Sequence, residues 1–185
     1  MNVVRVGAVA PRPWRNGGGV TRELLAVPAG SDWRVRVSVA DVATDGPFSA
    51  FPGVARWFAV LDGAGVELTI DGAVHRLAPG DAPLAFDGAA RTTCRPIAGP
   101  TRDLNLMLRG VAGRLVPARD GARRRPGLGQ CGLFTSAGGR CDADGTAGIE
   151  LPPGSLAWFD RAPAWLAFTA AAPGLAWWID AGAAA

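Results

Sequence analysis

The stretch PRPWRNGGGVTRE, residues 11–23, places three consecutive glycines between side chains that can bind a small polar molecule. Glycine allows the backbone to turn sharply or to approach another group closely. Asn16 offers both a donor and an acceptor, and Thr21 offers a hydroxyl group. A turn in which Asn16 bonds its own backbone is the local alternative, but it does not account for the flanking Trp14 and Glu23. The stretch therefore predicts the rim of a polar pocket.

Two later segments alternate polar and apolar residues, which is the pattern of β-strands. In WRVRVSVADV, Arg36 and Ser38 share one face, and in DLNLMLR, Asp103 and Asn105 share one face. For Arg36 and Ser38, periodicity alone favours a half-buried strand with a polar outer face. Asp103 and Asn105 fit a solvent-facing sheet and, equally well, the interior of a barrel with a wet pocket. The segment DGPFSAFPG between them carries two aromatic residues after a turn signal. It can cover a barrel mouth or form a packed turn.

The composition bounds the class of protein. Hydrophobic residues make up 49% and charged residues 19% of the 185-residue chain, which favours a globular core over disorder. The net charge is only +3. The basic run Arg123-Arg124-Arg125 lacks the interleaved aromatic residues of a nucleic-acid site, so we expect no nucleic-acid partner. The apolar segment near residues 164–179 is too short for a membrane span and contains Pro173-Gly174, and Arg5 interrupts any signal-peptide core.

The cysteines and the histidine argue against a metal site. The 3 cysteines form no CxxC pair, and the chain has 1 histidine. A zinc site built from these residue types is therefore not expected, and we predict no bound metal or cofactor. Reduced cysteines are typical of a cytoplasmic protein, which is the predicted localisation.

The predicted fold class is all-β, because short β-favouring runs recur between turn signals and helical periodicity is almost absent. In VELTIDGAVHRL, Asp71-Gly72 predicts a two-residue hairpin turn. Counting back from this turn places His75 opposite Leu68, on an apolar face, and Glu67 opposite Arg76. We interpret His75 as a core residue rather than a ligand, and the charged pair as a surface ion pair of small worth.

Two segments of the chain echo each other. LAPGDAPLAFD (77–87) and LPPGSLAWFD (151–160) both read as a strand, a Pro-Gly turn and a second strand. This predicts matching turns in two related barrels.

A longer stretch carries a family resemblance. Residues 56–88 resemble the body of a cupin barrel through Gly63-x-Gly65, the hairpin Gly72 and the run Leu77-x-Pro79-Gly80-Asp81. The segments PWRNGGGVTRE, RVSVADV, DGPFSAFPGVAR and GPTRDLNLM resemble the signature segments of the HutD/Ves family, which is associated with bacterial histidine utilisation. The resemblance implies a bicupin fold with no obligatory metal and a role in regulating histidine catabolism. Beyond residue 110 it rests on overall pattern.

The resemblance gives Arg56 a particular meaning. It places Arg56 where many cupins carry a metal-binding glutamate. The positions where those cupins carry metal-binding histidines hold no histidine in this sequence. A guanidinium at this position favours an anion, because arginine offers a rigid fork suited to carboxylate or phosphate. The alternative is that Arg56 points outward at the start of its strand.

We therefore predict a bicupin of two cupin-like β-barrels or sandwiches, with residues 1–110 and 111–185 as the halves and with strands open to exchange between them. The predicted function is a non-enzymatic protein that binds a carboxylate such as urocanate or formylglutamate and regulates histidine utilisation. The alternatives are a metal-independent cupin enzyme, an isomerase or hydrolase with Glu23, Asp103 or His75 as candidate acid or base, and a scaffold that binds a protein partner. A homodimer is a further possibility. The predicted ligand-binding residues are Trp14, Asn16, Thr21, Arg36, Ser38, Phe48, Phe51, Arg56, Asp103 and Asn105.

Overall fold

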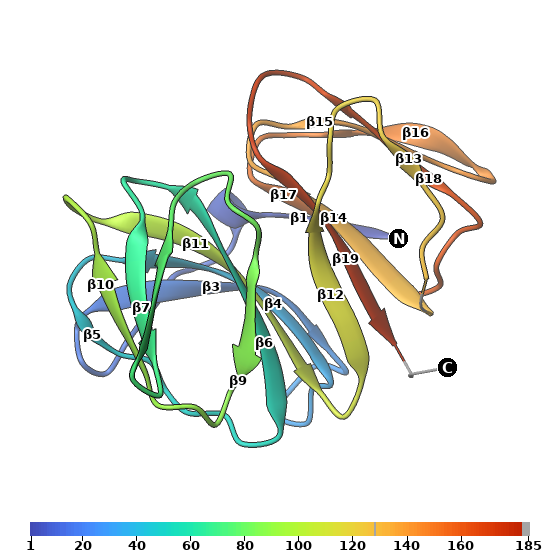
Figure 1. Cartoon of the computed structure of the whole chain (residues 1–185). Coiled ribbons are helices and arrows are strands. Elements are labelled where there is room, and N and C mark those ends of the chain that lie inside the picture. The colour runs from blue at the N-terminus through green and yellow to red at the C-terminus, as the bar shows by residue number, and fades with distance from the viewer. Residues whose placement is uncertain (128, 183–185) are drawn as a thin grey trace. The chain divides into compact units, whose positions relative to one another are not determined.

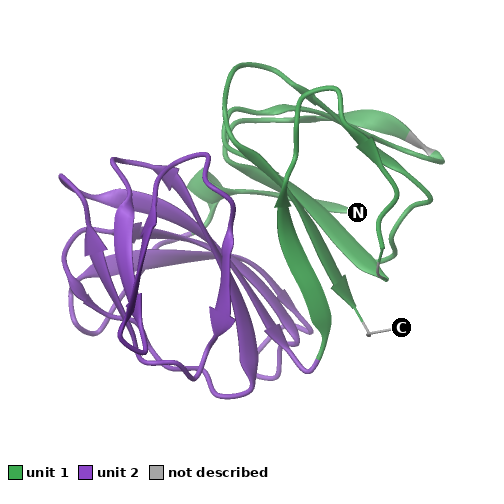
Figure 2. Ribbon diagram, in the orientation of Figure 1, with its two compact units in different colours: residues 1–9, 111–185 green, residues 10–110 purple. Residues whose placement is uncertain are grey.

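The computed structural model describes residues 1–127 and 129–182, and the regular secondary structure of these residues is β-strand apart from one short 3-10 helix, η1 (Val6–Ala8). The chain forms two compact units (Figure 2). Residues 10–110 form one unit, here called the N-terminal sandwich. Residues 1–9 and 111–185 form the other, here called the C-terminal sandwich. The all-β prediction is confirmed.

The N-terminal sandwich has two sheets (Figure 1). The large sheet has the order β2-β3-β4-β11-β6-β9, and the small sheet has the order β5-β10-β7-β8. The strands are β2 (Arg12–Pro13), β3 (Gly19–Val27), β4 (Val35–Val42), β5 (Gly46–Pro47), β6 (Val54–Asp62), β7 (Val66–Ile70), β8 (Ala73–Leu77), β9 (Leu84–Asp87), β10 (Thr92–Pro96) and β11 (Thr101–Arg109).

The C-terminal sandwich is also built from two sheets, with the orders β1-β17-β14-β19-β12 and β13-β18-β15-β16. The N-terminal strand β1 pairs antiparallel with β17, so the first residues of the chain belong to the same unit as the last. The strands are β1 (Asn2–Arg5), β12 (Ala112–Pro117), β13 (Arg123–Arg124), β14 (Gln130–Thr135), β15 (Gly139–Ala143), β16 (Thr146–Leu151), β17 (Ser155–Phe159), β18 (Leu166–Ala170) and β19 (Ala176–Gly182).

The two sandwiches share one topology. The small sheets run β5-β10-β7-β8 and β13-β18-β15-β16, and the large sheets contain the runs β4-β11-β6-β9 and β12-β19-β14-β17. The strands from β4 to β11 therefore correspond one for one with those from β12 to β19. Additional strands, β2 and β3 in one unit and β1 in the other, extend the large sheets.

The two similar sequence segments, residues 77–87 and 151–160, form the same turn in both units. After β8, residues 78–83 carry the chain from the small sheet to β9 in the large sheet, and after β16, residues 152–154 carry it to β17. The matching turns predicted from residues 77–87 and 151–160 are confirmed.

The predicted hairpin is confirmed residue by residue. Leu68 pairs with His75 and Glu67 pairs with Arg76, whose Nε lies 3.1 Å from the glutamate Oε2. Asp71 adopts a positive φ of 47° and Gly72 one of 90°, as a type I′ turn requires. His75 is half-buried. Sequence patterning missed the two-residue edge strands β2, β5 and β13, which are too short to show a period, and it also missed the longer strands β1, β12 and β15.

The interior of the N-terminal sandwich is apolar toward one end. A cluster of buried residues there includes Val60, Val66, Leu68 and Cys94. Because cross-strand partners share a side of the sheet, the register shows which side chains of the large sheet face this interior, and the polar ones among them form the site.

Candidate ligand-binding site

A pocket of about 490 Å³ opens into the N-terminal sandwich. All of its lining residues belong to that unit, and they come from the strands of the large sheet, from the loop before β3, and from β5 with the loop after it. The lining residues are Arg12, Pro13, Trp14, Arg15, Asn16, Thr21, Glu23, Arg36, Ser38, Ala40, Pro47, Phe48, Ser49, Phe51, Arg56, Asn105 and Met107.

Strand register explains why residues distant in sequence meet in this pocket. One row of cross-strand partners runs Glu23, Ser38, Asn105 and Phe58 on β3, β4, β11 and β6. The next row runs Arg36, Met107, Arg56 and Phe86 on β4, β11, β6 and β9. Because partners in a row share one face, a single sheet face gathers the polar groups that the sequence scatters over several segments.

Arg56 is the central charged group of the pocket. Arg56 is only 6% exposed, and its Nη2 donates a hydrogen bond of 2.9 Å to Asn105 Oδ1. Its guanidinium carbon lies 4.9 Å from the ring centre of Phe86 and 5.1 Å from that of Phe48. The outward alternative for Arg56 is therefore excluded, because the side chain lies among aromatic rings inside the sandwich.

Within the described part of the chain, the charge of Arg56 has no counter-ion. No carboxylate of the described residues forms an ion pair with it, and its buried Nε has no hydrogen-bond partner. Burial, and next the nearby charge of Arg36, lower the pKa of Arg56 to about 10. The guanidinium therefore remains charged at neutral pH, in surroundings that favour a bound anion.

Arg36 differs from Arg56 because it has its own carboxylate. Its Nε donates to Glu23 Oε2 at 2.7 Å, and its Nη1 lies 3.7 Å from the sulfur of Met107. The pair is partly buried. Glu23 thus neutralises Arg36, whereas Arg56 is a buried cation of the pocket that has no carboxylate partner among the described residues.

The rim of the pocket is built by the glycine-rich stretch. Trp14 Nε1 donates to Thr21 Oγ1 at 2.7 Å, and Asn16 Oδ1 accepts from the backbone N–H of Gly18 at 3.1 Å. Gly17 has a positive φ of 71°, and a Cβ on Gly19 would lie 2.4 Å from the Asp41 carbonyl oxygen. The glycines therefore let this backbone pack against β4 and beneath the Trp14 ring. The local turn considered for Asn16 does form, and Asn16 lines the pocket as well.

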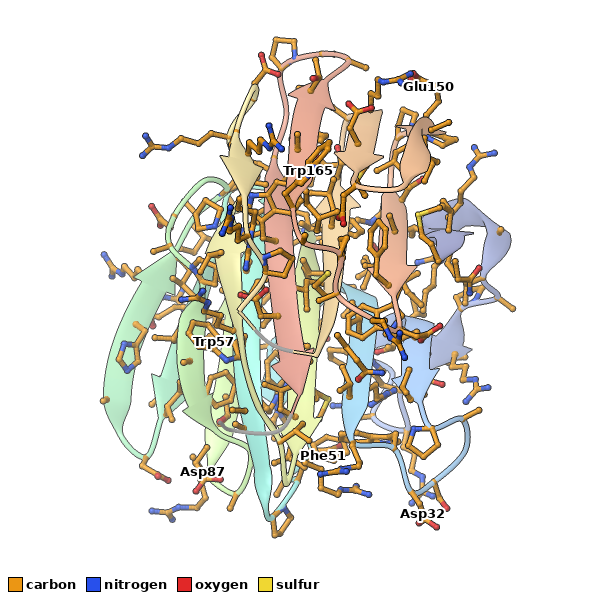
Figure 3. All side chains as sticks on the ribbon, turned by 90° about the vertical axis from the view of Figure 1, so that its right-hand side faces the viewer. Asp32, Phe51, Trp57, Asp87, Glu150 and Trp165 are labelled. Carbon is orange, nitrogen blue, oxygen red and sulfur yellow. The ribbon has the colours of Figure 1, made fainter. Side chains whose placement is uncertain are left out.

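The two aromatic residues of the loop after β5 also line the pocket. Phe48 packs edge-on against Trp14, with ring centres 5.9 Å apart, and Phe51 lies 5.9 Å from the Arg56 guanidinium carbon. Phe51 is labelled in Figure 3. Both side chains are half-buried, so the loop is packed and borders the pocket at the same time.

The structure brings together every predicted ligand-binding residue except Asp103. Asp103 shares the inward face with Asn105, but its cross-strand partners are Ala40 and Val60, one row further toward the apolar end. It is fully buried, accepts a 3.1 Å hydrogen bond from Thr101 and does not line the pocket. The alternation of polar and apolar residues correctly predicted that Asp103 shares a face with Asn105. Alternation does not tell whether a residue on that face lies beside the pocket or at the apolar end of the strand.

The environment of Asp103 favours a neutral acid. Burial, and to a smaller extent the charge of Asp41, raise the pKa of Asp103 to about 8 against the lowering effect of the Thr101 hydrogen bond. Its Oδ1 has no hydrogen-bond partner, and no arginine pairs with it among the described residues. The carboxyl group is thus protonated in the folded protein at neutral pH.

Several lining residues were not among the predicted ligand-binding set. Met107 continues the alternation of Asp103 and Asn105, so the period-2 pattern contains it. Glu23 was considered only as a catalytic group. Arg12 and Arg15 lie beside the glycine stretch and are exposed at the rim. Nothing in their local pattern distinguishes them from other surface arginines.

The described residues contain no group of three or more His, Cys, Asp or Glu side chains placed to hold a metal ion. They also contain no helix that is long and apolar enough to cross a membrane. The donors that the pocket does offer are guanidinium, amide and hydroxyl groups, which suit an anionic organic ligand.

The fold has counterparts among cupins. A cupin 2 conserved barrel domain protein from Leptotrichia buccalis superposes with a TM-score of 0.59 at 11% identity, covering 97% of this chain and 95% of that one. At this identity the likeness concerns the fold alone, and it confirms the cupin-type sandwich.

The chain belongs to the HutD family, which it matches over residues 7–176. A Pseudomonas putida relative, described as an uncharacterized 21.2 kDa protein in the hutC 3′ region, is 38% identical over 130 residues. Protein Ves of Cronobacter sakazakii is 36% identical over 97 residues. The matches cover 68% and 52% of this chain, but only 63% and 54% of those two relatives.

The structure of HutD from Pseudomonas fluorescens SBW25 (formate condition) superposes with a TM-score of 0.85 at 29% identity. The superposition covers 100% of this chain and 99% of that chain. The family resemblance predicted from residues 13–107 is confirmed, and the likeness of the fold extends over the C-terminal sandwich, where the sequence signal was weak.

Proposed function

We propose that this protein is a non-enzymatic small-molecule binding protein that takes up a carboxylate in the N-terminal sandwich and regulates histidine utilisation through it. The observation that carries the proposal is Arg56. It is a buried guanidinium that, among residues 1–127 and 129–182, has no carboxylate partner and whose Nε has no hydrogen-bond acceptor. A buried charge of this kind is costly to maintain, and an incoming anion removes the cost.

The surroundings of Arg56 support an organic carboxylate rather than a bare ion. The pocket volume of about 490 Å³ falls in the range of small-molecule sites. Phe48 and Phe51 offer an apolar wall, while Ser38 and Asn105 offer hydrogen bonds beside the cation. A ligand with a carboxylate at one end and a flat or aliphatic body matches this arrangement.

The link to histidine utilisation comes from the family. The HutD match and the P. putida relative, whose description places it beside hutC, support a ligand from histidine catabolism. The P. fluorescens HutD structure is described for a formate condition, and formate is the simplest carboxylate. Urocanate and formylglutamate are therefore the first ligands to test.

The test is calorimetric titration of the protein and of Arg56→Ala with urocanate and with formylglutamate. Loss of one charge-assisted interaction costs about 1.5–3 kcal/mol, so the variant should bind roughly ten- to a hundredfold more weakly. Arg56→Lys should fall between the two, because lysine keeps the charge but lacks the planar fork. Arg91→Ala, an exposed arginine without an ion pair, is the matched control and should bind like the parent.

Two results would count against the proposal. If Arg56→Ala binds as tightly as the parent while its circular dichroism is unchanged, Arg56 is not the anion clamp. If the parent binds neither acid at millimolar concentration, the sensor function fails and the scaffold alternative gains.

One observation favours the alternative of a metal-independent cupin enzyme. Glu23 lines the same pocket as Arg56, so a general base and an anion clamp are both present. The ion pair with Arg36 occupies one Glu23 oxygen and leaves the other able to accept a proton. Incubation of the bound acid with the protein, followed by NMR of the ligand, separates the two functions, because only an enzyme converts it.

A further inference from the structure

The C-terminal sandwich contains a second group of arginines, outside the pocket described above. A surface cleft of about 460 Å³ is lined by Arg123, Arg124, Arg125, Ala164 and Trp165. The three arginines are consecutive in the chain. The first two form the edge strand β13, which pairs with β18 directly after Trp165.

Alternation along this edge strand gives the arginines different roles. Arg124 points inward, where its Nη2 donates to both carboxylate oxygens of Asp180. Asp180 is only 1% exposed and is also bound by Arg114, whose Nε lies 2.9 Å from its Oδ2. This buried ion pair anchors β13 to the sandwich and fixes the position of the neighbouring arginines.

Arg123 and Arg125 are both exposed, and neither forms an ion pair with a carboxylate of the described residues. The Arg123 guanidinium carbon lies 4.0 Å from the ring centre of Trp165, which is labelled in Figure 3. Stacking on an indole orders the guanidinium plane without consuming its hydrogen-bond donors. The side chain is therefore held in place with its N–H groups free.

The side chains that line the cleft carry positive charge, from Arg123, Arg124 and Arg125. Two carboxylates lie next to this lining: Asp180 pairs with Arg124, and Asp144 Oδ1 accepts a hydrogen bond from the backbone N–H of Trp165. A carboxylate ligand matches one guanidinium fork, whereas a phosphate group carries up to two charges and three terminal oxygens that several forks can share.

We propose that this cleft binds the phosphate group of a small phosphorylated molecule, with Arg123 and Arg125 as the primary contacts and Trp165 as the side wall. The site is separate from the carboxylate pocket of the N-terminal sandwich, and its existence does not depend on the function proposed for that pocket. Arg124 acts as a positioning residue whose charge is shared with Asp180.

The experiment is calorimetric titration of the full chain with inorganic phosphate and, as a singly charged comparison, with acetate, near neutral pH and at constant chloride. Each titration is repeated in the Arg56→Ala variant, so that binding in the N-terminal pocket does not contribute. Phosphate should bind in both proteins. The double variant Arg123→Gln/Arg125→Gln should weaken phosphate binding by about tenfold or more, the effect of losing charge-assisted contacts.

The matched control is Arg5→Gln/Arg91→Gln, which removes two exposed arginines without ion pairs and should bind phosphate like the parent. Trp165→Ala should weaken binding by a smaller factor than the double variant, because the Arg123 side chain loses its ordering but keeps its charge. Trp165→Phe should restore most of the affinity.

Three results would overturn the proposal. One is phosphate binding that is unchanged in Arg123→Gln/Arg125→Gln or weakened equally by the control pair. Another is phosphate binding that disappears in Arg56→Ala, which would assign it to the N-terminal pocket. The third is a single-stranded oligonucleotide that binds far more tightly than phosphate with a steep salt dependence, which would make the cleft a nucleic-acid surface instead.

Discussion

Each sandwich contains a buried aspartate, and the two aspartates differ in whether an arginine compensates the carboxylate charge. Asp180 in the C-terminal sandwich is 1% exposed and is bound by Arg114 and Arg124. Asp103 in the N-terminal sandwich is fully buried, has no arginine partner among the described residues and takes up a proton. The arginine that shares its sheet face, Arg56, remains without a counter-ion.

The comparison extends to the interiors. On strands β12, β19 and β14, one row of cross-strand partners reads Arg114, Asp180 and Cys131, and on the matching strands β4, β11 and β6 the pocket row reads Arg36, Met107 and Arg56. In the C-terminal sandwich the space beside this row is packed by Trp178 and Phe168, whose rings meet edge-on. One sandwich thus supplies its own anion and fills its interior. The other leaves a cation beside a pocket, which is the arrangement expected of a binding unit.

The largest effect is expected from breaking the internal ion pairs of the C-terminal sandwich. Asp180→Asn removes the charge but keeps the size of the side chain, so it leaves Arg124 partly buried without a counter-charge. Removing one partner of a buried ion pair typically costs about 3–5 kcal/mol. Urea unfolding followed by tryptophan fluorescence should show a loss of stability of that order.

Asp32→Asn provides the control for this measurement. Asp32 is exposed and forms no ion pair, so its variant should differ from the parent by less than about 0.5 kcal/mol. If Asp180→Asn is as stable as this control, the ion pairs with Arg114 and Arg124 do not hold the C-terminal sandwich together.

The second effect concerns the protonated Asp103. Because the folded-state pKa of about 8 lies above the unfolded value of 3.8, the folded protein binds the extra proton between these values. The resulting stability is complete below the unfolded pKa and is lost as the pH rises through the folded one. Asp103→Asn has no such proton. From mildly acidic pH up to the folded-state pKa, the free energy of unfolding of this variant should vary less than that of the parent, by about 2–4 kcal/mol.

The measurement is a series of urea unfolding curves from mildly acidic to mildly alkaline pH, recorded for the parent, Asp103→Asn and Asp32→Asn. The Asp32 variant should follow the parent at every pH. Parallel curves for all three proteins would show that Asp103 titrates normally and is not held neutral by burial.

The smallest expected effect concerns Arg56 in the absence of ligand. Arg56→Met replaces a buried, incompletely bonded guanidinium by an apolar side chain of similar length, so the ligand-free protein should become more stable by about 1–2 kcal/mol. Thermal unfolding of parent and variant measures this directly. A destabilised variant would mean that the contacts of Arg56 with Asn105 and Phe86 are structural, and the contrast between the two sandwiches would weaken.

The sequence by itself determined where most β-strands lie and which of their side chains share a face. Alternation placed Arg36 and Ser38 on one face of β4 and Asp103 and Asn105 on one face of β11, and Asp71-Gly72 set the register of the hairpin from Val66 to Leu77. These properties are local, because side-chain direction repeats every two residues and a two-residue turn fixes which residues pair. The membership of Trp14, Phe48 and Arg56 in one site was available only through the family resemblance.

Only the tertiary structure decided how the charged groups are paired and how deep each one lies. Glu23 and Arg36 are 13 positions apart in the sequence, yet the pairing of β3 with β4 brings them into contact. The buried Arg56 has no such carboxylate partner among the described residues. Asp103 and Asn105 have the same facing, but one lies against the apolar end and the other lines the pocket. Burial and ion pairing depend on which strands become neighbours, and that choice is made by the packing of the whole sheet rather than by any single segment.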